Sequence, residues 1–294
     1  MAGMPAASSR LFCFGLGASA LALSRMLLAE GWTVAGTCRS QEKAAALASE
    51  GIETFLFDGD VPMADFDGAL AGATHLLISA PPGKAGDPVL RHHAADLAAL
   101  TSVAWLGYLS TTGVYGDRQG AWVDETSDLR PSGERGQRRV DAENGWLALG
   151  LPVHLFRLAG IYGPHSNALM TVREGRAQRI DKPGQVFSRI HVDDIAEVLR
   201  ASIAKPNPGA AYNLCDDNPA PPEEVIRYAC ELLGVTPPPL VPFDQAQLSP
   251  MARSFYDDNK RVSNARIKTE LGVVLRYPDY KAGLEALAKG ASPS

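Results

Sequence analysis

Three small residues near the start of the chain stand at a spacing that could bind phosphate. Gly15, Gly17 and Ala20 form a G-x-G-x-x-A turn directly after the apolar residues 11–14. The first glycine of such a turn lets the chain reverse tightly, the second lets a phosphate approach the backbone, and the small third residue lets the next helix pack closely. The helix start adds N–H groups and the positive end of a dipole. The pattern predicts a cradle for the pyrophosphate of a dinucleotide, formed by Gly15, Leu16, Gly17, Ala18 and Ser19.

An alternative interpretation of the same segment is a signal peptide. Arg10 precedes the apolar run, and residues 18–20 resemble a cleavage site. Arg25, however, interrupts the apolar pattern, and a strand pattern follows at residues 33–37. We therefore favour the phosphate-binding turn.

The end of the second expected strand indicates which dinucleotide binds. Sites for NAD place an acidic residue there to accept hydrogen bonds from the ribose 2′-OH, whereas sites for NADP place a cation there. This chain has Thr37, Cys38 and Arg39, with no acid. We expect these three residues to contact the cofactor and to favour NADP(H) over NAD(H). The alternative for Arg39 is a solvated loop residue.

Two further segments follow expected strands and are candidate cofactor contacts. Asp58 closes the third strand, where a carboxylate could meet the adenine amino group or could simply form a turn. Ser79, Ala80 and Pro81 follow the fourth strand, at the edge where open α/β sheets bind ligands. The prolines of that segment could instead hold a rigid loop.

The elements that must position these residues alternate along the first half of the chain. Apolar runs predict strands near residues 10–14, 33–37, 52–57, 74–79, 103–110 and 152–159, with helices between them. This order is typical of an α/β fold with a Rossmann-type, doubly wound parallel sheet. We expect a Rossmann domain over residues 1–165, to which residues 190–215 return, and a smaller substrate-binding part over residues 166–294.

Two aspartates are expected to cap helices. Asp87 precedes Pro88, a favoured first helical residue. The inner face of that helix would carry Leu90, Ala94, Leu97 and Thr101. Asp193 is the expected N-cap of a helix that extends to about residue 204.

Bulk properties exclude several classes of protein. The net charge is −5 with no dense basic run, so we expect no nucleic-acid partner. The apolar stretches are too short to span a bilayer, so we expect no membrane association. The four cysteines, which form no C-x-x-C pair, predict neither a metal site nor a disulfide framework and point to the cytoplasm: Cys13, Cys38, Cys215 and Cys230.

Five segments together resemble the extended short-chain dehydrogenase/reductase family, the NAD(P)-dependent epimerase/dehydratase group. They are the glycine turn, STTGVYG at 110–116, FRLAGIYGP at 156–164, RIHVDDIA at 189–196 and AYNL at 211–214. The tail KRVSNAR at 260–266, with Leu271-Gly272, resembles an atypical branch often called YeeZ-like. The resemblance extends over nearly the whole chain. It also implies that a homodimer could form through the helices at 87–101 and 135–149.

In that family a Ser or Thr hydroxyl and a Tyr-x-x-x-Lys pair move protons. The resemblance places Thr111 at the hydroxyl position, but Arg135 stands at the tyrosine position and Arg139 at the lysine position, with Glu143 matching a family glutamate. A guanidinium has no acceptor lone pair, so Arg135 cannot act as a base. Arg139 could still bind ribose hydroxyls, and Tyr162 is a candidate replacement phenol.

Two hypotheses of different classes follow. The first is an NADP(H)-dependent oxidoreductase or epimerase/dehydratase-like enzyme that lacks the usual Tyr-x-x-x-Lys pair. Its substrate would be a small hydroxylated or carbonyl metabolite, such as a nucleotide sugar. The second is a non-catalytic NADP(H)-sensing protein that regulates a partner.

Overall fold

Residues 9–290, which the computed structural model describes, form two compact units. The first, called the sheet unit below, contains the described residues up to Ser110 together with Arg138–Arg157 and Ile195–Tyr212. The second unit contains Thr111–Gln137, Leu158–Asp194 and the residues from Asn213 onward. The expected division near residue 165, into a Rossmann domain and a substrate-binding part, remains a prediction.

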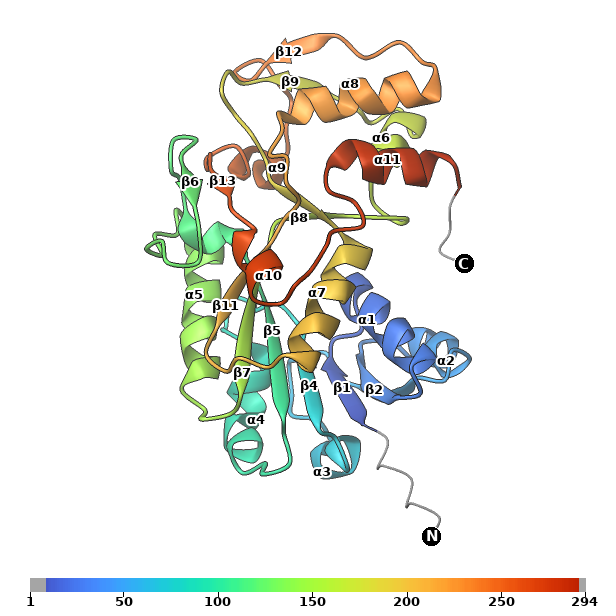
Figure 1. Cartoon of the computed structure of the whole chain (residues 1–294), viewed down its shortest axis with the longest axis vertical. Coiled ribbons are helices and arrows are strands. Elements are labelled where there is room, and N and C mark those ends of the chain that lie inside the picture. Colours follow the sequence, from blue (N-terminus) through green and yellow to red (C-terminus); the bar gives the residue numbers. More distant parts are fainter. Residues whose placement is uncertain (1–8, 291–294) are drawn as a thin grey trace. The chain divides into compact units, whose positions relative to one another are not determined.

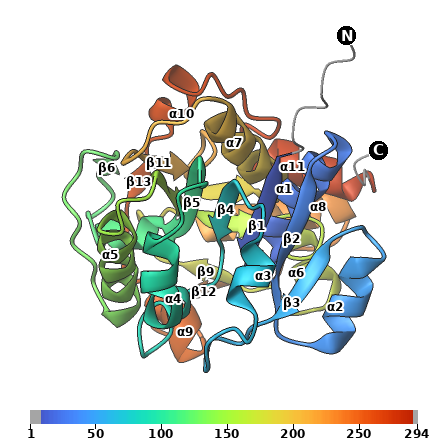
Figure 2. The ribbon, with the colours of Figure 1, turned by 90° about the horizontal axis from the view of Figure 1, so that it is seen from below.

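A seven-stranded sheet organises the sheet unit. Its strand order is β11-β7-β5-β4-β1-β2-β3, and the neighbours from β3 to β5 pair in parallel. Helices α4 and α5 cover one face, and α1 and α7 cover the other (Figures 1 and 2). The prediction of an α/β fold with a doubly wound, Rossmann-type sheet is therefore confirmed.

Strands and helices alternate along this part of the chain, as expected. The strands of the sheet are β1 (Arg10–Phe14), β2 (Thr33–Cys38), β3 (Glu53–Leu56), β4 (His75–Ile78), β5 (Trp105–Thr111), β7 (Val153–Leu158) and β11 (Ala211–Leu214). The helices that accompany them are α1 (Ala18–Ala29), α2 (Gln41–Ala48), α3 (Phe66–Leu70), α4 (Pro88–Ala98), α5 (Glu134–Leu147) and α7 (Val192–Ala204).

Short strands and helices make up the second unit. Its strands are β6 (Trp122–Val123), β8 (Gly160–Tyr162), β9 (Arg179–Asp181), β10 (Arg189–His191), β12 (Leu240–Pro242) and β13 (Arg261–Val262). Its helices are the 3-10 helix η1 (Thr112–Tyr115), α6 (Ala168–Arg173), α8 (Pro222–Leu233), α9 (Pro250–Ser254), α10 (Ala265–Thr269) and α11 (Tyr280–Ala288). The strands pair in parallel as β8–β10, β9–β12 and β6–β13.

Both faces of the central strands are apolar because helices cover both faces. On β1, Phe12 and Phe14 belong to a core cluster that includes Trp146 of α5. The residue between them, Cys13, points to the opposite face, where its Sγ lies 3.8 Å from Oγ of Ser24 in α1. The continuous apolar run in the sequence therefore reflects burial on two sides.

The inner face of α4 matches the expected one at Leu97 but is displaced by one position in the first turns of the helix. Its buried residues are Val89, His93 and Leu97. The expected Leu90 and Ala94 are only half-buried, and the helix ends before Thr101. His93 departs from helical geometry, with φ of −132°, and its ring turns inward to accept the N–H of Met63 through Nε2 at 2.9 Å.

The two expected caps have different outcomes. Asp87 is the N-cap of α4, where its Oδ1 accepts two N–H groups of the first turn, so this prediction is confirmed. The cap at Asp193 is wrong, because α7 begins one residue earlier and Asp193 lies inside its first turn. Instead, Nδ1 of His191 accepts the N–H of Asp193 at 3.2 Å.

A buried ion pair joins α5 to β7. The side chains of Glu143 and Arg157 are 2% and 7% exposed, and Arg157 donates from Nη2 to Oε2 at 2.8 Å and from Nε to Oε1 at 3.2 Å. The hydroxyl of Ser110 on β5 donates to the same carboxylate. Two-point pairing of this kind fixes both side chains in direction as well as distance.

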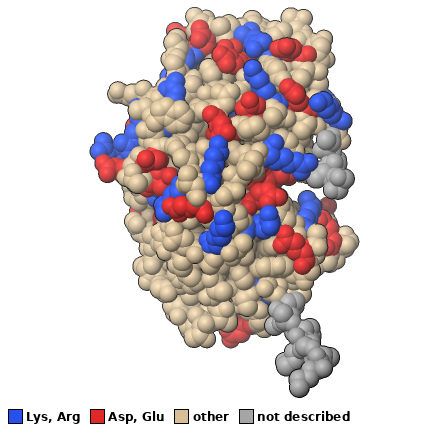
Figure 3. All heavy atoms as spheres, viewed as in Figure 1, with Lys and Arg blue, Asp and Glu red and all other residues tan. Residues whose placement is uncertain are grey.

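The surface carries both signs of charge. Figure 3 shows lysines and arginines interspersed with acidic residues, without an extended basic patch on the face in view. Among the described residues no helix is long and apolar enough to cross a membrane. No group of three or more His, Cys, Asp or Glu side chains in the same residues could hold a metal ion.

We predict that Glu143→Gln lowers the free energy of unfolding by about 3–5 kcal/mol, because it leaves the Arg157 charge buried without its counter-ion. Urea denaturation of the full chain measures this change. Glu50→Gln removes the exposed partner of Arg25 and is the control, with an expected loss below about 1 kcal/mol. Equal effects of the two substitutions would contradict the prediction.

Candidate functional site

The glycine turn lies between β1 and α1, as predicted. Gly15 has φ of +92°, a conformation that disfavours other residues, and a Cβ there would lie 3.0 Å from the backbone nitrogen of Ala80. At Gly17 the nearest atom to an added Cβ is Oγ of Ser79, at 3.8 Å. Protein packing therefore explains Gly15 but leaves open space above Gly17, where a ligand's phosphate could approach.

The N-terminus of the helix that follows, α1, has features that favour an anion. Gly17 is the N-cap of α1, makes no side-chain cap hydrogen bond, and is followed by a first turn without acidic residues. Gly17 and Ala18 are exposed, whereas Ser19 and Leu16 are buried. The N-terminal N–H groups and the helix dipole at such a site favour negative charge.

The end of β2 holds the glycine turn in place. Oγ1 of Thr37 accepts the N–H of Gly15 at 2.8 Å, and its carbonyl oxygen accepts the N–H of Leu16 at 2.9 Å. Cys38 is buried, and Arg39 is exposed. The structure thus brings Thr37 into direct contact with the turn and leaves the Arg39 guanidinium accessible to solvent.

Lys43 is a residue at this turn that the sequence analysis missed. Its Nζ donates to the carbonyl oxygen of Leu16 at 2.6 Å. Ser40 caps α2 by accepting the Lys43 N–H, which places the lysine in the first turn of the helix. The sequence shows a lysine three residues after a serine that could cap a helix. Where that lysine side chain points, however, depends on how α2 packs.

The other two candidate segments follow β3 and β4. Oδ1 of Asp58 accepts the N–H of Asp60 at 2.9 Å, so this side chain forms a turn and remains exposed. The N–H groups of Ser79 and Ala80 both donate to the carbonyl oxygen of Phe14, at 2.9 and 2.8 Å. The structure therefore brings the segment that continues to Pro81 next to the glycine turn.

Arg139 is held by β5. Its Nη1 donates to the carbonyl oxygen of Leu109 at 2.6 Å and to the phenol of Tyr108 at 3.3 Å. Arg135, one turn earlier on α5, lies in the second unit with its guanidinium 5.6 Å from the ring centre of Phe255. Neither arginine offers an acceptor for a proton.

Thr111 and Tyr162, the two candidate catalytic residues, both line one cavity of about 860 Å³ in the second unit. Thr111 is the last residue of β5, and its Oγ1 accepts the N–H of Gly113 at 3.1 Å. That contact leaves the hydroxyl hydrogen available to a ligand. The cavity also contains residues 247–249 and much of α9, a segment with no motif that the sequence analysis recognised.

The surroundings of Tyr162 disfavour its anion. Its phenol donates to the carbonyl oxygen of Asp279 at 3.4 Å, and a Cβ on Gly283 would lie 2.1 Å from the phenol oxygen. Burial raises the pKa of Tyr162 well above its usual value, and the carboxylates of Asp216 and Asp194 raise it further. A phenol in this environment stays protonated at neutral pH and is poorly placed to act as a base.

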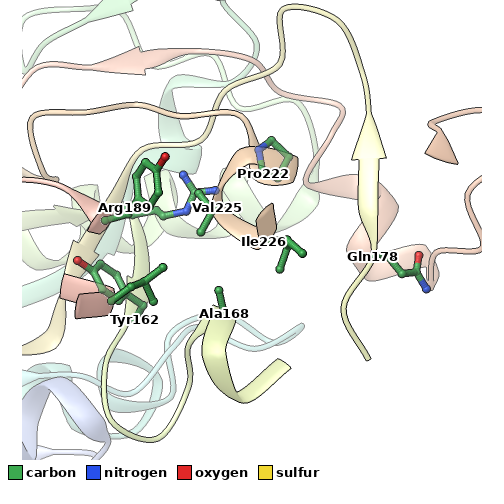
Figure 4. Close-up of a pocket in the computed structure, with 9 residues that line it drawn as sticks. Tyr162, Ala168, Gln178, Arg189, Pro222, Val225 and Ile226 are labelled. Carbon is green, nitrogen blue, oxygen red and sulfur yellow. The ribbon is translucent and has the colours of Figure 1, made fainter. Parts of the chain in front are cut away.

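Tyr162 also lines a smaller cavity of about 290 Å³. Figure 4 shows Tyr162 and Arg189 on one side of it, near Pro222 and Val225 of α8, with Ala168 of α6 below. Tyr115, the tyrosine of the segment 110–116, is fully buried and donates to Oδ1 of Asn213 at 2.8 Å.

Asp216 is a buried acid near Arg189. Its Oδ1 accepts the N–H of Asn218 at 3.2 Å, and its buried Oδ2 has no partner. Burial raises the pKa of Asp216 to about 7, although the Asn218 hydrogen bond and the Arg189 charge act in the opposite direction. At neutral pH this carboxyl group is therefore partly protonated.

We predict that Asp216 makes the second unit less stable as pH rises from about 4 to 7. The folded state keeps the proton over this range while the unfolded state releases it, a difference of order 4 kcal/mol for a pKa near 7. Asp216→Asn, which keeps the neutral form, should flatten this part of the profile of unfolding free energy against pH. Asp244→Asn at an exposed position is the control, and an unchanged slope in Asp216→Asn would contradict the prediction.

No family model matches the chain. Protein YeeZ of Escherichia coli (strain K12) is 29% identical over 282 residues, which cover 90% of this chain and 95% of that protein. A conserved protein of unknown function from Silicibacter pomeroyi DSS is 53% identical, with a TM-score of 0.89 over 97% of this chain and all of that one. A Methylobacillus flagellatus protein, provisionally named an NAD-dependent epimerase/dehydratase, is 25% identical, with a TM-score of 0.68 over 97% of this chain and 99% of that one. These similarities support the resemblance of the chain to the extended short-chain dehydrogenase/reductase family and its YeeZ-like branch.

Proposed function

We propose that the chain binds a nicotinamide dinucleotide through the glycine turn of the sheet unit. The observation that carries this proposal is the open space at Gly17, where a Cβ would meet nothing closer than 3.8 Å although the residue begins a helix. A glycine that packing does not require, at a helix start without acidic residues, is suited to a pyrophosphate. Gly15, Leu16, Ala18 and Ser19 complete this cradle.

NADP(H) is the preferred dinucleotide in this proposal. Thr37 and Cys38 at the end of β2 offer no carboxylate to a ribose 2′-OH, and both are buried. Arg39 is exposed directly after them, and the ammonium of Lys43 lies at the glycine turn. Two cations and no acid at this place favour a 2′-phosphate. Asp58 and the segment from Ser79 to Pro81 remain candidate contacts.

The proposed activity is that of an oxidoreductase or an epimerase/dehydratase-like enzyme acting on a small hydroxylated or carbonyl metabolite. The bound dinucleotide would supply or accept a hydride. The Thr111 hydroxyl would hold the substrate oxygen by a hydrogen bond, and Arg139 would bind the cofactor ribose. The raised pKa of Tyr162 makes its phenol a weak proton donor, and its O–H already donates to the Asp279 carbonyl oxygen, so the proton for the substrate oxygen would come from solvent water.

A second candidate function is an NADP(H)-sensing protein without hydride chemistry. The observation that favours it is the engagement of both arginines at the family's catalytic positions: Arg139 binds the Leu109 carbonyl oxygen, and Arg135 stacks on Phe255. Such a protein would keep the cofactor cradle and lose the proton relay. Its partner would distinguish the cofactor-bound from the free form.

We predict that Gly17→Ala weakens NADPH binding by about tenfold or more, because the added methyl occupies ligand space, and lowers the melting temperature only slightly, because Ala is a weaker N-cap than Gly but meets no protein atom here. Titration calorimetry and thermal denaturation measure the two effects. Gly83→Ala is the control, because it adds a methyl group in open space at a residue without a positive φ. Gly209 would not serve, because its φ of +88° strains any other residue. NADPH binding that survives Gly17→Ala unchanged would refute the proposed cradle.

Arg39→Ala should weaken NADPH binding and leave NADH binding nearly unchanged, because only NADPH carries the 2′-phosphate. The expected loss is about tenfold, the effect of one charge-assisted hydrogen bond. Arg173→Ala, a cation near the end of α6 in the second unit, is the control. An equal loss for both nucleotides, or none for NADPH, would overturn the assignment to NADP(H).

A further inference from the structure

The large cavity of the second unit has mostly apolar walls. Its lining includes Leu158, Ile161, Ile180, Phe187, Leu248 and Met251. Phe187 also packs edge-on against Tyr256, with ring centres 5.3 Å apart, so the aromatic part of the wall is fixed. A volume of about 860 Å³ is in the range of cavities that enclose a molecule of several rings.

Three large apolar side chains of this cavity are exposed to water. Ile161, Met251 and Phe255 are 44%, 62% and 54% exposed, and all three belong to the lining. Concave apolar surface that remains in contact with water is typical of a ligand site. A ligand with an apolar body would cover these side chains and release the water.

The cations that line the cavity already donate to acceptors within the protein. Nζ of Lys260 lies 3.0 Å from Oδ2 of Asp258 and 2.9 Å from a backbone carbonyl oxygen. Nη1 of Arg189 donates to two backbone carbonyl oxygens, at 2.8 and 3.1 Å. Arg176 pairs with Glu174. A diphosphate would have to compete with these contacts and would bring two negative charges among apolar side chains.

Two hydroxyl groups supply the polar contacts that a neutral ligand needs. Thr111 accepts the N–H of Gly113, and Ser188 accepts the N–H of Val262 at 3.3 Å. Each hydroxyl uses an oxygen lone pair in that contact and keeps its hydrogen for another acceptor. One carbonyl or alcohol oxygen of a ligand could accept such a bond.

We propose that this cavity takes an uncharged aromatic ketone or aldehyde, or the corresponding alcohol, and does not take a nucleotide sugar. The apolar body of the ligand would lie against Phe187, Met251 and Phe255, and its oxygen would face Thr111 or Ser188. As the substrate of the enzyme this class rests on the proposed function, but its binding does not require the cofactor.

The test is calorimetric titration of the full chain, without cofactor, with 4-phenylbutan-2-one as the neutral aromatic ketone and with UDP-glucose as the charged comparator. The ketone should bind and UDP-glucose should not displace it. Phe255→Ala should weaken ketone binding by about fivefold or more, because it removes an apolar contact area, and Phe255→Leu should retain most of the affinity. Met251→Ala is the second variant, with a loss in the same direction.

Val274→Ala is the matched control, because Val274 is 87% exposed and does not line the cavity. Its ketone affinity should equal that of the unmodified chain. Three results would overturn the inference. The ketone does not bind at millimolar concentration, UDP-glucose binds more tightly than the ketone, or neither Phe255→Ala nor Met251→Ala changes the ketone affinity. The proposed function fails by different results: the chain does not bind NADPH, or it binds NADPH equally well after Gly17→Ala.

Discussion

The buried ion pair between Glu143 and Arg157 determines where α5 lies. Both charges are removed from water, so each is stable only while the other is in place, and the two-point contact fixes the helix against β7 in direction as well as distance. Arg139 stands one turn before Glu143 on the same helix. Its guanidinium therefore reaches the Leu109 carbonyl oxygen at the end of β5. The ion pair thus helps to hold the Arg139 cation, which has no acceptor capacity, at the end of β5.

The glycine turn depends on a different set of contacts. Thr37 holds the turn from β2, and the N–H groups of Ser79 and Ala80 fix the neighbouring segment on the Phe14 carbonyl oxygen. None of these contacts involves α5. The contacts that hold the glycine turn therefore do not depend on the residues of α5, and the two proposed functions share the cofactor while they differ in chemistry.

The large cavity of the second unit exposes apolar side chains, while its cations donate to protein acceptors. Tyr162 on the wall is kept protonated by burial and by nearby carboxylates. A neutral substrate held by hydroxyl groups suits such a cavity better than an anion. The same environment makes Tyr162 a poor general base.

The sequence by itself determined the alternation of strands and helices in the sheet unit, the Asp87 cap and the glycine turn, because each depends on residues close together in the chain. Periodicity misplaced the inner face of α4, since a bond from the distant Met63 turns His93 inward. It also misplaced the cap of α7, since β10 continues directly into the helix. Only the tertiary structure decided that Lys43 reaches the glycine turn and that α9 lines the cavity with Thr111. Those contacts join residues far apart in the chain, and their geometry depends on packing that local patterns do not encode.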